Sequence, residues 1–196
     1  MADEKTLRDD KPTITPHPAD TFAAVCCDVI DLGLTVEEYE GKTSLKDKVA
    51  IGFRTEAVQD NGQPHHIYRE FTATFGPKAN LRKFLEAWRG KAYTDDEAKK
   101  QGIPLHKLVG HPALVSIAHK VSRAGNTYAI ISSIMPLPKA MRDGVPTLDG
   151  YERGEWWAKK KLEYEAKAKA FLAARDAHEL AGAEPLVDDE DDGLPW

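Results

Sequence analysis

Basic and aromatic side chains recur along the parts of this chain that alternate between apolar and polar residues. Cations of this kind can follow a phosphate backbone, and a flat ring can stack on an unpaired base. The combination is typical of surfaces that bind single-stranded nucleic acid without reading its sequence. The candidate binding residues are Lys46, Lys48, Arg54, Tyr68, Arg69, Arg82, Lys83, Arg89, Lys120, Arg123 and Tyr128.

Each of these candidates also has an ordinary structural interpretation. A lysine or arginine outside a core most often keeps the surface hydrated. Tyr68 could simply cover the flank of the fold. Trp88 falls on the apolar stripe of a predicted helix, so we expect it in the core. We likewise expect Phe53, Phe71 and Phe75 to be core residues rather than stacking platforms.

A strongly acidic segment ends the sequence, where residues 184–196 read EPLVDDEDDGLPW. Such a run neither buries apolar area nor neutralises itself, so we expect it to be disordered. Improved solubility is one role for it, but an exposed tryptophan suits a pocket on another protein. The residues that we expect to bind a partner are Asp188, Asp189, Glu190, Asp191, Asp192, Leu194, Pro195 and Trp196.

The charge of the chain is unevenly distributed. The formal net charge is −5, from 27 Lys and Arg against 32 Asp and Glu. Residues 184–196 hold six of those acids and no base, so the remainder carries 27 bases and 26 acids, a net charge of +1. A near-neutral body can still bind a polyanion if its bases gather on one face.

Residues arranged for catalysis or metal binding are not evident in the sequence. His106 and His111 are five positions apart, which is not the helical spacing of a zinc hydrolase. Cys26 and Cys27 are adjacent, so a mutual disulfide would be strained and both are expected to be small buried apolar residues. We therefore expect a binding protein that is not an enzyme and that holds neither a metal nor another cofactor.

The spacing of apolar residues predicts five strands, at 21–31, 48–58, 65–75, 113–121 and 127–135. Turns rich in Asn and Gly join the second to the third and the fourth to the fifth. A helix capped by Asn80 and ended by Gly90 falls between the third and fourth strands, followed by a short helix with a capping box at Thr94. The pattern predicts a mainly β fold, a five-stranded OB-like Greek-key barrel with a helical insert, followed by a long C-terminal helix.

Four regions follow from this pattern. We expect a flexible arm over residues 1–19, the barrel over 20–139, a linker and helix over 140–183, and the acidic segment over 184–196. No apolar run approaches the ~18 residues that span a membrane, and the first residues lack the apolar core of a signal peptide. These features favour a protein of the bacterial cytoplasm.

Two parts of the chain resemble known groups of proteins. Residues 21–137 contain Asp31-Leu32-Gly33, the run LRKFLEAWRG at 81–90 and LVGHP at 108–112, and these resemble a family of phage proteins of DNA replication and recombination. That resemblance implies an OB-like domain that binds single-stranded DNA. The acidic segment is similar to the tip of bacterial single-stranded DNA-binding proteins, in which the last residue is usually Phe where this chain has Trp196.

The two resemblances together imply a phage protein that coats single-stranded DNA in the cytoplasm of the bacterial host. Its acidic segment would recruit a polymerase, helicase, primase or recombinase. Two alternatives stay open. One is an adaptor whose barrel binds protein, and the other is an accessory protein that anneals strands. The sequence leaves open whether the chain forms a homo-oligomer.

Overall fold

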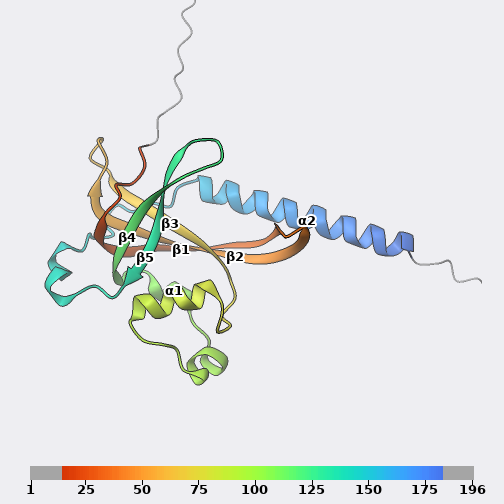
Figure 1. Cartoon of the computed structure of the whole chain (residues 1–196), viewed down its shortest axis with the longest axis horizontal. Helices are drawn as coiled ribbons and strands as arrows, with labels where there is room; N and C mark the ends of the chain where they lie inside the picture. Colours follow the sequence, from red (N-terminus) through yellow and green to blue (C-terminus); the bar gives the residue numbers. More distant parts are fainter. Residues whose placement is uncertain (1–14, 183–196) are drawn as a thin grey trace, which may run out of the picture. The chain divides into compact units, whose positions relative to one another are not determined.

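The computed structural model describes residues 15–182 (Figure 1), so most of the predicted arm and the whole acidic segment lie outside the described residues. Their contacts divide the chain into two compact units, one with residues up to Asp31 and Val49–Arg153, the other with Leu32–Lys48 and the chain from Gly154. The elements are β1 (Thr21–Tyr39), β2 (Lys42–Val58), β3 (Pro64–Thr72), α1 (Asn80–Arg89), η1 (Glu97–Gln101), η2 (Leu105–Leu108), β4 (Pro112–Val121), β5 (Thr127–Met135), η3 (Lys139–Gly144) and α2 (Trp156–Gly182). The predicted mainly β fold with five strands and a C-terminal helix is confirmed.

The strands form one open antiparallel sheet in the order β3-β2-β1-β4-β5. β1 pairs with β4, with Thr21 opposite Ser116, and β4 pairs in turn with β5. The two edge strands also approach each other, because the Arg69 guanidinium on β3 donates a hydrogen bond to the Ile131 carbonyl on β5 at 3.2 Å. The sheet is therefore strongly curved, and one of its faces encloses the core of the first unit.

That core is built from alternate residues of the strands, as the period of two predicts. Phe53 and Phe71 are buried, so their predicted place in the core is confirmed. Full burial of an apolar side chain contributes about 1.5–3 kcal/mol. The buried cluster comprises Ala24, Cys26, Val49, Ile51, Phe53, Ile67, Phe71, Leu81, Phe84, Leu85, Trp88, Ala113, Val115, Ile117, Ile131 and Ile134.

The first strand is buried on both of its faces. Cys26 points into the core cluster, and Cys27, on the opposite face of β1, is buried as well. Burial raises the pKa of each thiol to about 12, so both stay protonated at neutral pH. The prediction of free, buried cysteines is confirmed.

Helix α1 packs against β3 and β5 and buries the predicted stripe that ends in Trp88 (Figure 1). Gly90 ends the helix with a φ of 71°, and its N–H reaches the carbonyls of Glu86 and Ala87. The predicted cap at Asn80 is wrong. Ala79 occupies the cap position without a side-chain hydrogen bond, and Asn80 is the first helical residue.

The first two strands are longer than predicted. β1 continues beyond its predicted end at Asp31 and through Gly33, which adopts a φ of 71° within the strand. The chain then turns at Glu40 and Gly41, with φ of 51° and 73°, and returns along β2. Residues 32–48 therefore form a two-stranded ribbon in the second unit where a loop was expected.

The connections from α1 to β4 and from β5 to α2 contain short helical turns. The predicted capping box is confirmed: the Glu97 N–H donates to the Thr94 hydroxyl at 3.2 Å, and the Thr94 N–H donates to the Glu97 carboxylate at 2.8 Å. The turn that it begins, η1, is π-helical, whereas η2 and η3 are 3-10 helices.

Helix α2 shares the second unit with the ribbon of residues 32–48. It begins at Trp156, within the predicted region of linker and helix, and its buried positions include Trp157 and Ala168. These two residues are 11 apart, which is close to three turns of an α-helix, so they lie on one face. Among the described residues no helix is both long and apolar enough to cross a membrane.

Ordered contacts begin before the boundary predicted at residue 20. His17 is buried, and its Nε2 lies 2.6 Å from the hydroxyl of Thr55 on β2. The His17 carbonyl lies 2.8 Å from His119 Nε2 on β4. His17 therefore packs against β2 and β4 in the first unit.

Candidate nucleic-acid interface

The β4–β5 hairpin brings together three of the predicted binding residues. Lys120 and Tyr128 are direct cross-strand partners, so their side chains lie on the same face of the hairpin. Arg123 is exposed in the turn between them, and Tyr128 is 45% exposed. One cation thus lies across the hairpin from an exposed aromatic ring, and a second cation is exposed in the adjoining turn.

Local hydrogen bonds fix the shape of this hairpin tip. The Ser122 N–H donates to the Asn126 carbonyl at 2.9 Å, and the Asn126 N–H donates back to the Ser122 hydroxyl at 3.1 Å. Gly125 takes a φ of 81°, a conformation that favours glycine. Because the turn is closed by its own bonds, it presents Arg123 at a defined place between the two strands.

The outward face of β2 and β3 holds two further candidates, but a later segment of the first unit contacts both. Arg54 Nη1 donates to the Asp149 carbonyl at 2.8 Å, and the hydroxyls of Tyr68 and Tyr151 lie 2.9 Å apart. The Tyr68 ring lies directly over Gly52, where a Cβ would clash with it. Residues 149–153, which we call the strap, therefore contact the face that sequence reasoning assigned to DNA.

A buried acid anchors the strap. Both oxygens of the Asp28 carboxylate accept hydrogen bonds from the Arg153 guanidinium at 2.6 Å, and the Tyr151 hydroxyl donates at 2.7 Å. Burial alone would raise the pKa of Asp28, but the bonds from Arg153 and Tyr151 outweigh it and hold this pKa below its ordinary value. Burial, together with the bonds to Tyr68 and Asp28, raises the pKa of Tyr151. Sequence reasoning missed this cluster, although a charged residue inside the apolar run of β1 signals a buried partner.

Two other predicted cations hold the fold together. Arg69 joins β3 to β5 and lies over the rings of Phe71 and Phe84, 5.2 and 5.5 Å from their centroids. Arg82 donates to Glu86 at 2.8 Å and to the Tyr93 carbonyl at 2.9 Å. The contacts of both side chains are thus internal.

Helix α1 carries the remaining candidates of the first unit, Lys83 and Arg89. Lys83 is exposed. Arg89 donates to Glu97 at 2.6 Å and lies over the Tyr93 ring at 4.7 Å. The hydrogen bond from Arg89 lowers the pKa of Glu97 to about 2, so this pair stays charged at neutral pH.

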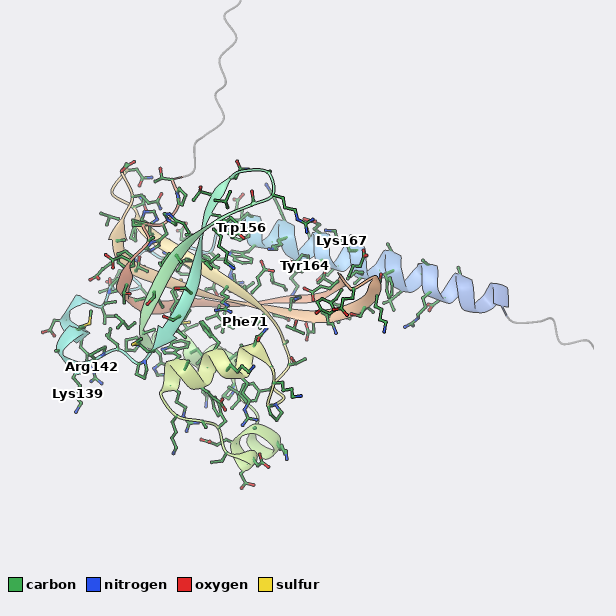
Figure 2. All side chains as sticks on the ribbon, in the orientation of Figure 1. Phe71, Lys139, Arg142, Trp156, Tyr164 and Lys167 are labelled. Atoms are coloured by element: carbon green, nitrogen blue, oxygen red, sulfur yellow. The ribbon has the colours of Figure 1, made fainter. Side chains whose placement is uncertain are left out.

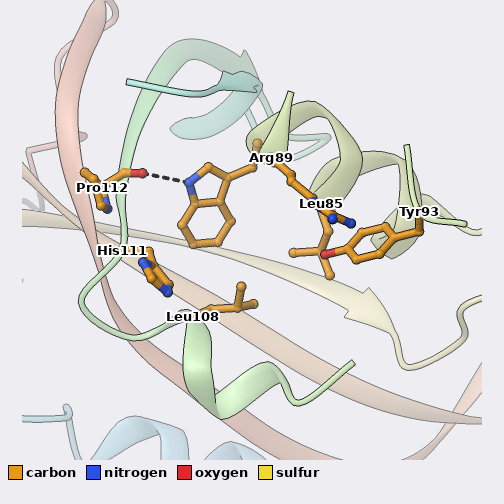
Figure 3. Close-up of a pocket in the computed structure, with 7 residues that line it drawn as sticks. Leu85, Arg89, Tyr93, Leu108, His111 and Pro112 are labelled. Carbon is orange, nitrogen blue, oxygen red and sulfur yellow. Dashed lines mark hydrogen bonds between the residues drawn. The ribbon is translucent and has the colours of Figure 1, made fainter. Parts of the chain in front are cut away.

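A pocket of about 270 Å³ opens beside Arg89 (Figure 3). Its base includes Trp88, whose indole N–H donates to the Pro112 carbonyl at 2.8 Å, shown as a dashed line. The pocket is mostly apolar, with Arg89 and His111 as its basic members. Its lining residues are Leu85, Trp88, Arg89, Tyr93, Leu108, His111 and Pro112.

The second unit contains Lys46 and Lys48, on the β2 side of the ribbon. Lys48 forms an ion pair with Glu37 on β1, across the ribbon, and its side chain is 11% exposed. Lys46 is half-buried. The predicted partner-binding residues from Asp188 to Trp196 lie outside the described residues.

Three of the histidines, His17, His65 and His119, form a packed group. The rings of His17 and His65 lie 4.6 Å apart, and burial lowers the pKa of both. Within residues 15–182, no three histidine, cysteine or acidic side chains are placed to hold a metal ion. The group therefore contributes packing to the first unit.

Neither the protein-family models nor the curated protein sequences compared with this chain contain a match to it.

Proposed function

We propose that this protein binds single-stranded DNA, largely without sequence specificity. The proposal is carried by one observation, the accessible ring of Tyr128 opposite Lys120 on the β4–β5 hairpin, with Arg123 exposed in the turn that joins the two strands. Stacking of one base on an aromatic side chain stabilises such complexes by about 1–3 kcal/mol, and it is tolerant of sequence because every base has a flat face. The two cations would contact the phosphates on either side.

The fold supports an OB-like barrel as the scaffold of this function. The strand order, the approach of β3 to β5 and the position of α1 between β3 and β4 agree with a five-stranded Greek-key barrel. Barrels of this kind use the connection between their last two strands for oligonucleotides. Tyr128 and Arg123 lie at that connection.

The strap changes the path that we propose for DNA. Arg54 and Tyr68 are bonded to residues 149–153, so DNA on the outward face of β2 and β3 would have to displace these contacts. Arg69 and Arg82 have internal contacts as well. We therefore assign the first contact with DNA to the β4–β5 hairpin.

The acidic segment supplies the second half of the proposal. Its residues Asp188–Asp192 are charged like DNA, and the neighbouring Leu194, Pro195 and Trp196 are apolar. We propose that it recruits enzymes of phage DNA replication or recombination in the host cytoplasm while the barrel protects the single strand.

Titration of fluorescent oligo-dT of several lengths at two salt concentrations tests the function. We expect Tyr128→Ala to weaken binding by about 1–3 kcal/mol, and Tyr128→Phe to retain most of the affinity. Lys120→Ala should make the slope of log K against the logarithm of salt concentration shallower by about 0.7, which is the contribution of one phosphate contact. Val121→Ala is the matched control, because Val121 is a neighbouring exposed residue without a ring or a charge.

Two outcomes would contradict the proposal. Absence of oligonucleotide binding would favour an adaptor that binds protein. Equal affinity for duplex and single strand would remove base stacking as the basis of recognition.

A further inference from the structure

Four aromatic and basic side chains gather at the beginning of α2, in the second unit. Figure 2 labels two of them, Trp156 and Tyr164. The Trp156 ring stacks on Trp157, with centroids 3.8 Å apart and planes inclined by 28°. Lys160 Nζ lies 5.8, 5.6 and 5.4 Å from the centroids of Trp156, Trp157 and Tyr164. The sequence predicted this helix, but none of these four residues was expected to bind a ligand.

The two tryptophans differ sharply in exposure. Trp157 is 1% exposed and belongs to the core, whereas Trp156 is 50% exposed. Trp156 therefore keeps half of its surface in solvent, although one face of its ring lies against Trp157. A half-exposed tryptophan costs solubility, and its indole offers the largest flat surface of any side chain for stacking.

The Trp156 ring is held in place before any ligand arrives. Besides the stack on Trp157, its Cδ1–Nε1 edge lies against Gly154, where an added Cβ would be 2.8 Å from Cδ1. Lys160, one turn later, places its charge over the same pair of rings. Little side-chain entropy is therefore left to lose on binding.

The charge around this ring matches a polyanion. Residues 155–169 contain five lysines and three glutamates. Lys159, Lys160 and Lys161 are consecutive and follow the tryptophans directly, and Lys159 is exposed. Glu163 is bonded to Lys167 at 2.6 Å, so this ion pair removes one acid and one base from the balance and leaves the excess of lysines unchanged.

We propose that Trp156 is a stacking platform for a base of single-stranded nucleic acid, with the exposed Lys159 contacting its phosphates. This inference deepens the proposed DNA-binding function and depends on it. It assigns to α2 a binding site made of residues other than those of the β4–β5 hairpin. Because an indole face and lysine charges carry no pattern of donors and acceptors that distinguishes bases, the site is indifferent to sequence.

The test compares full-length variants by oligo-dT anisotropy and by tryptophan fluorescence. Trp156→Ala should weaken binding about 5- to 150-fold and remove most of the fluorescence quenching that bound bases cause. Trp156→Phe should lose much less affinity, since a ring is kept. Leu162→Ala is the matched control, because Leu162 is a 66% exposed apolar residue of the same helix.

Cross-linking gives a second measurement that does not depend on the stability of a variant. Oligo-dT containing 5-iododeoxyuridine should cross-link to the tryptic peptide of residues 154–159, which contains Trp156. If wild-type protein binds oligo-dT but Trp156→Ala binds equally and no cross-link forms in that peptide, this inference is overturned and the hairpin proposal survives. If wild-type protein does not bind oligo-dT, both are overturned.

Discussion

At the scale of single residues, the most constrained group is the Asp28 carboxylate. Its side chain is 8% exposed and receives three hydrogen bonds, two from Arg153 and one from Tyr151. When a buried carboxylate loses its cationic partner, the free-energy cost of its desolvation remains, but the attraction of the ion pair no longer offsets that cost. The strap is therefore tied to β1 by a bond whose loss we expect to reduce stability measurably.

Arg153→Ala should lower the free energy of unfolding by about 1–2 kcal/mol at pH 7, less than for a fully buried pair because half of the Arg153 side chain is in solvent. The pKa of Asp28 is lower in the folded protein than in the unfolded chain, where it is about 4. The contribution of Asp28 to the free energy of unfolding is therefore complete above that unfolded pKa, and it declines as the pH falls through the folded pKa. Urea unfolding at pH 7 and pH 3 measures this, and the difference between variant and wild type should shrink at pH 3.

The matched control is Arg175→Ala. Arg175 is bonded to its neighbour Asp176 at 3.4 Å, and both side chains are more than half exposed. We expect its effect to stay within about 0.5 kcal/mol at both pH values. An equally small effect of Arg153→Ala at pH 7 would show that the strap does not depend on this ion pair.

At the scale of elements, the features that were predicted correctly depend only on residues close together in the sequence. The turn Ser122–Asn126, the apolar stripe of α1 and the capping box at Thr94 are properties of neighbouring residues, and all are found in the structure. The predicted end of β1 at Asp31 is wrong. A glycine with positive φ, such as the Gly33 that follows, can either end a strand or let it continue through an irregularity.

Contacts between distant residues could not be predicted in the same way. Asp28 and Arg153 are 125 positions apart, and the strap has neither the period of a helix nor that of a strand. Cations on the predicted strands therefore seemed equivalent, whereas the structure separates Arg54 and Arg69, which have internal contacts, from the exposed Lys120. The sequence indicated a type of surface but not which residues remain accessible on it.

The packing of β3 on β2 gives a prediction at this scale. Gly52→Ala should destabilise the protein by about 1–3 kcal/mol, because the new Cβ would lie 2.6 Å from Cδ1 of the Tyr68 ring. Tyr68 would then move away from Tyr151 and weaken the strap. Thermal unfolding compares this variant with Gly76→Ala, whose Cβ would meet no atom within 4 Å. Equal transition temperatures for the two variants would contradict the tight packing of Tyr68 on Gly52.

At the scale of the whole molecule, electrostatic interactions act between parts of the chain that need not be in fixed contact. Residues 184–196 hold six acids, and without them the chain has a net charge of +1. A tethered polyanion competes with DNA for cationic surfaces, and this competition acts through space over roughly the Debye length, about 10 Å at 0.1 M salt. The acidic segment therefore serves, in our proposal, both as a recruiting sequence and as a competitor of DNA.

Removal of residues 184–196 should tighten oligo-dT binding several-fold at low salt, with the gain disappearing at high salt as screening weakens the competition. Changing Asp188, Asp189, Asp191 and Asp192 to Asn should reproduce the gain, because these residues supply four of the six acids. Changing Leu194 and Trp196 to Ala should leave oligo-dT affinity unchanged, since it keeps every charge. An unchanged affinity after the deletion would refute the competition. A gain from the Leu194 and Trp196 changes alone would show that the apolar tip, rather than the charge, opposes DNA.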